Sequence, residues 1–385
     1  MKKVILTLLI GILGVNPVPL YAYDPLTHQK MSEYAVNASA LTTDSKILDN
    51  LGLPPLSANK TYPNSQFFSK QRAIVDLFRD GAEFEDSLFR PANHFFDPLT
   101  GKGLAIGTPS PDWAIDGTGD SSTIKFSYKA AREYLWQATA NPLNNYAYRQ
   151  KQFGLMFETL GHVIHHIQDM AQPQHVRNDT HCDVIPCYLL GIHNPSLYEL
   201  VTKDDEKKSY LTYIGYDPVY SSADTATFNA PRKFWTTTVN SNSGMGIAEY
   251  TNRGFVSAGT NFDTLAYTQP ALSSASAVPT DIATLCAEEV AAGYAACPAG
   301  LSGNMTMYSS TVTDSYRSAG TQVNPRTSTR SIYDQYLIDA GKGPVFSLNR
   351  FTFHAAQKLL IPHAVGYSAG LINTFFRDSI SGSPA

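Results

Sequence analysis

The histidine-rich stretch between residues 162 and 175 restricts the fold of this chain more than any other feature. It closes the longest helical pattern in the sequence, residues 145–171, which Pro173 is expected to end because proline cannot continue the hydrogen bonding of a helix. On a helix, His165 and Asp169 are four residues apart and lie on one face. The turn at Pro173 lets His175 return toward that face. Because Zn²⁺ accepts imidazole and carboxylate ligands, this spacing predicts a metal site.

A simpler interpretation is a helix that carries surface histidines, but three histidines and an aspartate on a helix with several apolar residues argue against it. His166 competes with His165, because His162 and His166 are also four residues apart. Asp169 follows His165 by one turn, which favours His165 as the ligand. His162 is then expected in a supporting position and His166 as a structural histidine. Eight of the ten histidines lie between residues 28 and 193, which places the chemistry in the front half.

The first 22 residues have the pattern of a secretory signal peptide. Lys2 and Lys3 precede an apolar run over residues 4–15 that is too short to span a bilayer comfortably, and cleavage after Ala22 fits. We therefore expect a soluble, monomeric protein that is secreted or periplasmic. Without those two lysines, 27 basic residues face 33 acidic ones, a formal charge of −6. This acidic balance argues against tight binding of long nucleic acids, which depends on phosphate neutralisation.

The four cysteines are expected to form disulfides in an oxidising compartment. The pairing of sequence neighbours, Cys182–Cys187 and Cys286–Cys297, is one of three arrangements. In a straight helix over residues 281–297 the second pair would lie roughly 16 Å apart, whereas a disulfide needs Cα atoms within about 7 Å. Either the helix breaks near Gly293 or this pairing is wrong.

Four further helices follow from local patterns. Asp24-Pro25 resembles an N-cap followed by proline in the first turn, and opens a helix to about Ala38. Apolar periodicity predicts the others over residues 66–84, 123–140 and 350–377, the last kinked near Pro362.

Two segments lack this periodicity. Residues 91–121 are rich in Gly, Pro, Asp and Thr, and form a loop long enough to be functional. Residues 205–345 are rich in Ser, Thr, Tyr, Asn and Gly. We expect this second segment to be an elaboration of the helical core with short strands, or else a small second domain.

Three stretches resemble the superfamily of zinc-dependent phospholipases C and fungal single-strand nucleases. The spacing of His165, Asp169 and His175, with Gln-Pro before the last histidine, is similar to the superfamily signature. Asn93-His-Phe-Phe-Asp-Pro-Leu-Thr-Gly101 is similar to a segment of the bacterial phospholipases C. Tyr23 and His28 stand five apart, which resembles the nucleases. The resemblance covers about residues 23–199 and the last helix, and it does not account for residues 205–345.

The resemblance implies an all-α, multi-helix phospholipase C/nuclease-like domain, to which we add an irregular, partly β insertion. The expected parts follow the chain in order. They are a signal peptide (1–22), a helical zinc-binding catalytic core (23–204), a polar insertion or elaboration (205–345), a C-terminal helix that completes the core (346–378) and a tail (379–385).

The resemblance also implies three zinc ions in one cleft. The carboxylate ligand contributed by residues 81–86 is Asp86 by its spacing from the glycine, with Glu83 as the alternative. The implied ligands are His94, His165, Asp169 and Asp86 for the first ion, His175, His193 and Glu199 for the second, and His28, Asp169 as a bridge and the backbone amine and carbonyl of Tyr23 for the third.

Two departures from the family pattern bear on these ligands. The family has tryptophan where this chain has Tyr23, but the ligands there are backbone atoms, and cleavage after Ala22 would free the amine. His193 and Glu199 are six residues apart, whereas the family spacing is four, so the second ion has the weakest support. His181 with the two nearby cysteines is another candidate set of metal ligands, although a disulfide is favoured in an exported chain.

The resemblance implies hydrolysis of phosphate esters. The ions would neutralise the phosphate and activate a water molecule, with Asp169 serving two ions and Asp86 acting as ligand and general base. We expect a phospholipase C that cleaves phospholipid headgroups and contacts the membrane peripherally. One alternative is a single-strand nuclease or nucleotidase, which would bind nucleic acid. Another is a non-catalytic, zinc-stabilised surface protein whose residues 205–345 bind a partner or glycan.

Overall fold

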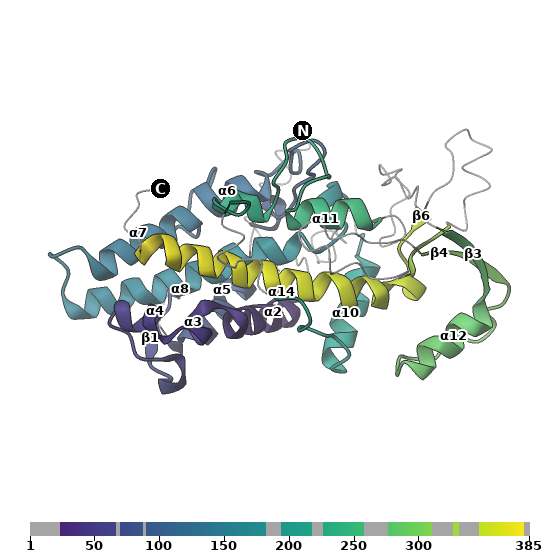
Figure 1. Ribbon diagram of the computed structural model, residues 1–385, viewed down its shortest axis with the longest axis horizontal. Helices are drawn as coiled ribbons and strands as arrows, with labels where there is room; N and C mark the ends of the chain where they lie inside the picture. Colours follow the sequence, from purple (N-terminus) through teal and green to yellow (C-terminus); the bar gives the residue numbers. More distant parts are fainter. Residues whose placement is uncertain are drawn as a thin grey trace, which may run out of the picture.

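The computed structural model describes residues 24–66, 70–87, 90–181, 194–217, 226–257, 276–309, 326–330 and 346–380. These residues are mostly helical, with two small antiparallel sheets (Figure 1). The helices are α2 (Pro25–Ala38), α3 (Ala40–Thr43), α4 (Ser45–Asn50), α5 (Ile74–Phe84), α6 (Ser110–Asp116), α7 (Tyr128–Thr139), α8 (Tyr146–Asp169), α10 (Leu197–Lys207), α11 (Ile247–Gly254), α12 (Ile282–Ala291) and α14 (Arg350–Ile380). Short 3-10 turns are η1 (Leu56–Ala58), η2 (Arg90–Asn93), η3 (His175–Arg177) and η4 (Pro231–Phe234).

Helix α8 is the central element of the fold. The side chain of Asn145 caps its start by accepting a hydrogen bond from the amide of Tyr148, and the helix ends at Asp169, two residues before the predicted end at residue 171. Every residue from Gln152 to Asp169 is buried. Helices α5, α7 and α14 pack against α8, and α2 packs mainly against α5 and α14. The second half of α8 is therefore enclosed on all sides, including its histidines.

Two glycines let α5 and α8 approach closely. A Cβ atom at Gly161 in α8 would lie 2.3 Å from the carbonyl oxygen of Phe78 in α5. A Cβ atom at Gly81 would lie 2.0 Å from the carbonyl oxygen of Glu158. Because both obstacles are backbone atoms, no side chain can rotate to make room. The two glycines thus set the separation between the helices that carry the histidines and the 85–86 carboxylates.

The start of the chain's first helix follows the prediction. Asp24 accepts a hydrogen bond from the amide of Leu26, and Pro25 occupies the first turn of α2. Helices α5 and α7 begin later than predicted, at Ile74 and Tyr128. Residues before α5 form a two-stranded ribbon instead, in which β1 (Thr61–Pro63) pairs with β2 (Gln71–Ala73). The apolar periodicity did not distinguish these short strands from a helical turn.

Helix α14 runs as one element of 31 residues through Pro362. It spans much of the long axis of the molecule (Figure 1). By length and composition it could cross a membrane, but 94% of its most apolar window is buried inside the protein. Its apolar surface is therefore covered by the fold, which agrees with a core helix.

Residues 226–257 belong to the same hydrophobic core as the front half. Phe228, Phe234 and Trp235 are fully buried in it, and α11 packs against η3 and α14. A separate four-stranded sheet has the order β3 (Ser276–Asp281), β4 (Asn304–Ser309), β5 (Arg326–Arg330) and β6 (Phe346–Ser347). Part of the segment predicted as an elaboration thus completes the core, and part forms a small sheet.

The pairing Cys286–Cys297 is present as a disulfide with a Cα separation of 5.6 Å. Helix α12 ends at Ala291, and Gly293 has a φ of +90°, which is readily adopted only by glycine. The helix therefore breaks where the disulfide requires it. Cys182 and Cys187 lie outside the described residues.

Replacing Gly161 with alanine should weaken the fold although alanine favours a helix by about 1 kcal/mol over glycine. The new methyl group must push α5 away from α8, and we expect a net loss of about 1–3 kcal/mol in the free energy of unfolding. Urea denaturation of the two proteins in chelator measures this. Unchanged or increased stability of Gly161→Ala would show that the helices do not approach this closely.

Candidate metal centre

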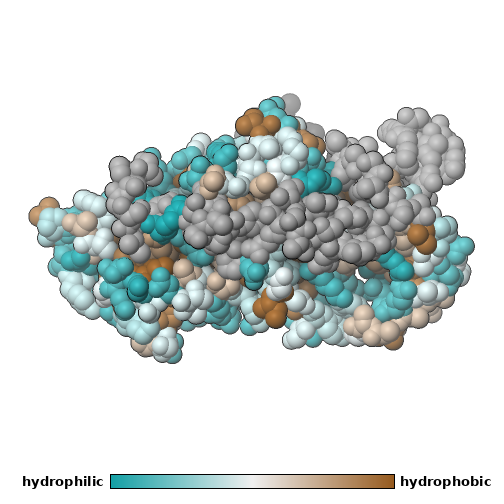
Figure 2. Space-filling view, in the orientation of Figure 1, coloured by the Kyte–Doolittle hydropathy of each residue, from teal (hydrophilic) through white to brown (hydrophobic). Residues whose placement is uncertain are grey.

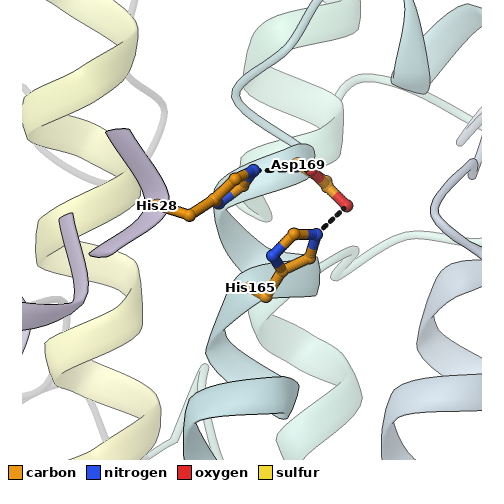
Figure 3. A group of neighbouring side chains, drawn as sticks. All are labelled: His28, His165 and Asp169. Atoms are coloured by element: carbon orange, nitrogen blue, oxygen red, sulfur yellow. Dashed lines mark ion pairs between the residues drawn. The ribbon is translucent and has the colours of Figure 1, made fainter. Parts of the chain in front are cut away.

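Four elements bring five titratable side chains together at the end of α8. They are His28 from α2, Asp86 just after α5, His94 just after η2, and His165 and Asp169 from α8. All five have an exposed fraction of 0%. Figure 3 shows His28 reaching from α2 toward the two α8 residues. We call these five residues the central cluster.

Neighbouring carbonyl groups fix which nitrogen of two histidines faces the central cluster. His165 donates from Nδ1 to the carbonyl oxygen of Ala82 at 2.7 Å, so its Nε2 carries the lone pair. His28 donates from Nδ1 to Oε1 of Gln168 at 2.7 Å. The amide of Gln168 is held in this orientation because its Nε2 donates to Ser32. Both Nε2 lone pairs therefore point at the carboxylates, as metal ligands require.

Asp169 lies between the histidines and uses both oxygens. Its Oδ1 is 3.5 Å from Nε2 of His28, and its Oδ2 is 3.2 Å from Nε2 of His165 (Figure 3). The same Oδ2 is 3.0 Å from Nδ1 of His94. The carboxylate thus faces two groups of ligands, one through each oxygen. This is the arrangement expected of a bridging ligand.

Asp86 completes the second of these groups. Its Oδ1 lies 3.4 Å from Nδ1 of His94 and 3.5 Å from Nε2 of His165. Glu83, the alternative carboxylate, lies elsewhere and accepts a hydrogen bond from Gln29. Of the two, Asp86 is therefore the one that the fold brings to the histidines.

The carboxylates of Asp86 and Asp169 make no hydrogen bond within the described part of the chain, although both are fully buried. A buried carboxylate that accepts no hydrogen bond costs several kcal/mol unless a cation balances its charge, and such groups are rare in native proteins. A cation bound between the carboxylates and the imidazole nitrogens would satisfy these atoms together. The donor set of nitrogen and oxygen atoms fits a divalent metal ion.

The pKa values of the buried histidines and carboxylates in the central cluster are shifted by burial and by the charges of their neighbours. Burial acts to lower the pKa of His94, but the carboxylates of Asp169, Glu85 and Asp86 together outweigh it and raise that pKa to about 10. Burial raises the pKa of Asp86 to about 7, against the pull of His165 and His94. Burial also opposes ionisation of Asp169, yet the same two histidines hold its pKa well below the usual range. The cluster concentrates negative charge that needs protons or a cation to balance it.

A second group of ligands lies beside the central cluster. One nitrogen each from His175 and His181 and one oxygen from Glu199 lie within 4.8 Å of one another. Nδ1 of His175 is also 3.7 Å from Oδ1 of Asp169. His175 and Glu199 were expected together. His193 and Tyr23, the other residues predicted near these two clusters, lie outside the described residues.

Glu85, which is buried behind the central cluster, was not predicted from the sequence as part of the site. Its oxygens accept hydrogen bonds from the guanidinium of Arg90 at 2.9 and 2.6 Å and from the indole of Trp113 at 2.9 Å. His162 and His166 contact it at 2.5 and 2.9 Å. These donors occupy the carboxylate, so Glu85 is a structural anion and not a free ligand. The spacing of His162 and His166 by one helical turn was the signal that a partner lies opposite them.

Glu85 also accounts for the roles of its two histidines. His166 contacts Ser110 as well as Glu85, and is the structural histidine that the sequence suggested. His162 pairs with Glu85 and stacks on Phe126, so it does not contact the central cluster ligands directly. Oε1 of Glu85 lies 3.8 Å from Nε2 of His94, whose other nitrogen faces Asp86 and Asp169. A carboxylate behind a ligating histidine orients the ring and raises its basicity.

A scan against models of protein families gave no match for this chain, and searches for similar curated proteins and for similar solved structures gave none either. The site must therefore be interpreted from its own geometry.

Replacing Glu85 with glutamine should destabilise the protein even without metal. The change leaves Arg90 without its buried counter-charge and turns an NH₂ group toward other donors, so we expect a loss of roughly 3–5 kcal/mol. It should also weaken metal binding by about tenfold or more through His94. Urea denaturation in chelator and titration with zinc measure the two effects.

Glu83→Gln is the matched control, because Glu83 lies two residues earlier and is partly exposed. It should change the free energy of unfolding by less than about 1 kcal/mol and leave zinc affinity unchanged. Equal effects of the two substitutions would contradict the role assigned to Glu85.

Proposed function

We propose that this protein is an exported, zinc-dependent phosphodiester hydrolase of the phospholipase C type. The observation that supports this most is the pair of buried carboxylates without hydrogen bonds, Asp86 and Asp169, which face three imidazole groups. Imidazole and carboxylate ligands suit zinc better than magnesium or calcium, which prefer oxygen ligands alone. The front-half histidine pattern and its resemblance to the zinc phospholipases supply the reaction class.

The residues of the central cluster would hold zinc in two places. His94, His165, Asp86 and Oδ2 of Asp169 would bind one ion. His28 and Oδ1 of Asp169 would bind another, together with the amine and carbonyl of Tyr23 once the signal peptide is removed. Asp24, at the start of α2, forms an ion pair of 2.7 Å with Lys203 of α10. That contact holds the residue after Tyr23 close to the helix that carries Glu199.

Zinc bound in this cluster would acidify a water molecule and offset the negative charge of a phosphodiester. Side chains of the cluster and its neighbours would hold the ligands in place and accept the proton. Asp169 holds the two halves of the cluster together through its two oxygens. Asp86 would be the general base through the oxygen that does not bind the ion, since neither of its oxygens accepts a hydrogen bond from the described residues. Glu85 keeps His94 oriented toward the ion.

The segment that resembles the bacterial phospholipases C favours a phospholipid substrate. Asn93 fixes this segment, since its side chain donates to the carbonyl of Arg90 and accepts from the amide of Thr108. Phe95 stacks on His175 at 4.3 Å, and the amide of Phe96 donates to the carbonyl of His175. The segment therefore packs against His175, beside the central cluster. A nuclease or nucleotidase is the second candidate, because His28 lies in the cluster and stands five residues after Tyr23 as in the nucleases.

The coloured part of the surface in Figure 2 is mostly hydrophilic, with hydrophobic residues in separate spots. Among the described residues, the most exposed large apolar side chains are Leu143, Val239 and Ile106, at 90%, 86% and 85%. They come from three different loops. On this proposal, peripheral contact with a membrane would use such exposed apolar side chains.

Activity assays on the secreted protein test the proposal. A phosphocholine diester and phosphatidylcholine should be hydrolysed, and single-stranded DNA should be cleaved much more slowly. Chelator should abolish hydrolysis and zinc should restore it. Asp86→Asn and Asp169→Asn should each lower the rate by at least about 100-fold, with Asp169→Asn the more damaging because it serves two ions.

Asp76→Asn is the control, since this aspartate lies on α5 and its side chain is 38% exposed. It should leave the rate unchanged. Hydrolysis that survives complete removal of metal would contradict the proposal. Faster cleavage of DNA than of either choline ester would favour the nuclease, and zinc binding without any hydrolysis would favour the non-catalytic surface protein.

A further inference from the structure

The group formed by His175, His181 and Glu199 contains a buried imidazole that makes no hydrogen bond within the described residues. His175 is 1% exposed, and neither of its ring nitrogens makes a hydrogen bond within the described residues. Phe95 packs on one face of the ring, so the ring is held in place. Its Nδ1 lies 3.7 Å from Oδ1 of Asp169, and one of its nitrogens lies within 4.8 Å of a nitrogen of His181.

An ion pair between His181 and Glu199 does not satisfy all three side chains of this group. Nε2 of His181 lies 2.7 Å from Oε1 of Glu199, so these two side chains can satisfy each other. That pairing leaves His175 unsatisfied, and a buried polar group without a hydrogen bond costs about 1–3 kcal/mol. The ring of His181 lies 5.3 Å from the ring of His175. A cation placed among the three side chains would engage all of them.

The backbone between the two histidines is shaped to bring them together. Asn178 has a φ of +52°, in the left-handed region, and ends the turn that begins at His175. The amide of Asp179 donates to the carbonyl of Gln174, which closes the turn. The chain thus reverses after Arg177 and returns His181 to the side of His175. Asparagine is among the few residues other than glycine that adopt this conformation readily.

Glu199 is positioned by contacts from the same region. Gln172 donates from Nε2 to Oε1 of Glu199 at 2.6 Å. Ser196 donates to Gln174 at 2.6 Å and caps α10 by accepting from the amide of Glu199. These bonds tie the first turn of α10 to the loop that carries His175. The carboxylate of Glu199 is therefore held beside His175 and His181 before any ion binds, as is expected of a preorganised ligand.

We propose that His181, with His175 and Glu199, binds a further zinc ion beside the central cluster. The inference deepens the proposed function and rests on it for the identity of the ion. It assigns the ligand to His181, whereas the family pattern points to His193. Two nitrogens and one oxygen leave a fourth position open, as in sites where zinc takes part in a reaction.

Zinc content of the mature protein tests this assignment. Wild type, His181→Ala and His193→Ala are loaded with zinc, freed of loosely bound metal and measured by mass spectrometry of the metal. His181→Ala should contain one equivalent less per chain than the wild type, and His193→Ala should match the wild type. An unchanged zinc content in His181→Ala would overturn the inference, most clearly if His193→Ala lost the ion instead.

Two further measurements keep a folding defect from imitating the result. His181→Gln should also lose one equivalent, and both His181 variants should keep the zinc of the central cluster, which an unfolded chain could not. His354→Ala is the matched control, because His354 pairs with Asp205 and Glu289 away from the clusters; it should keep all its zinc. If the wild type bound no zinc, the proposed function itself would be wrong. If the wild type depended on zinc but the His181 variants kept every ion, only the assignment of His181 would be wrong.

Discussion

The carboxylate of Asp169 is the interaction on which the rest of the site depends. It is fully buried and lies within 3.0 to 3.7 Å of nitrogens from His28, His94, His165 and His175. Those histidines come from α2, the segment after η2, α8 itself and η3. One negative charge therefore connects four elements that are far apart in the sequence. Such a charge is stable in the interior only if cations or protons surround it, which is why the histidines converge there.

Glu85 provides a second buried anion, one layer behind the first. Its charge is balanced by Arg90 and by hydrogen bonds, whereas that of Asp169 is balanced only by the cluster. The two buried carboxylates therefore have different roles in the same core. The satisfied anion holds α5, α6 and α8 together, and the unsatisfied one is left for an ion. The close approach of α5 and α8 at Gly81 and Gly161 keeps both anions next to the same row of histidines.

Much of the helical core and of the central cluster could be predicted from the sequence, because the patterns that indicate them are local. The cap at Asp24, the period of α8 and the spacing of His165 and Asp169 depend on neighbouring residues only. The choice of Asp86 over Glu83 followed from the resemblance, and the fold agrees with it. The predicted start of α5 was wrong, because the residues before it pair as β1 and β2, and such pairing cannot be read from the local pattern. Glu85 and the position of His181 were missed for the same reason: their partners are 77 and 18 residues away along the chain.

The most direct test of the account is the position of zinc in crystals of the mature protein. Anomalous scattering measured above and below the zinc edge locates the ion without reference to activity. The account predicts a peak bonded to Asp86, His94, His165 and Asp169, at about 2.0–2.2 Å from each ligand atom. Absence of any peak there, in protein purified with zinc and never exposed to chelator, would contradict it.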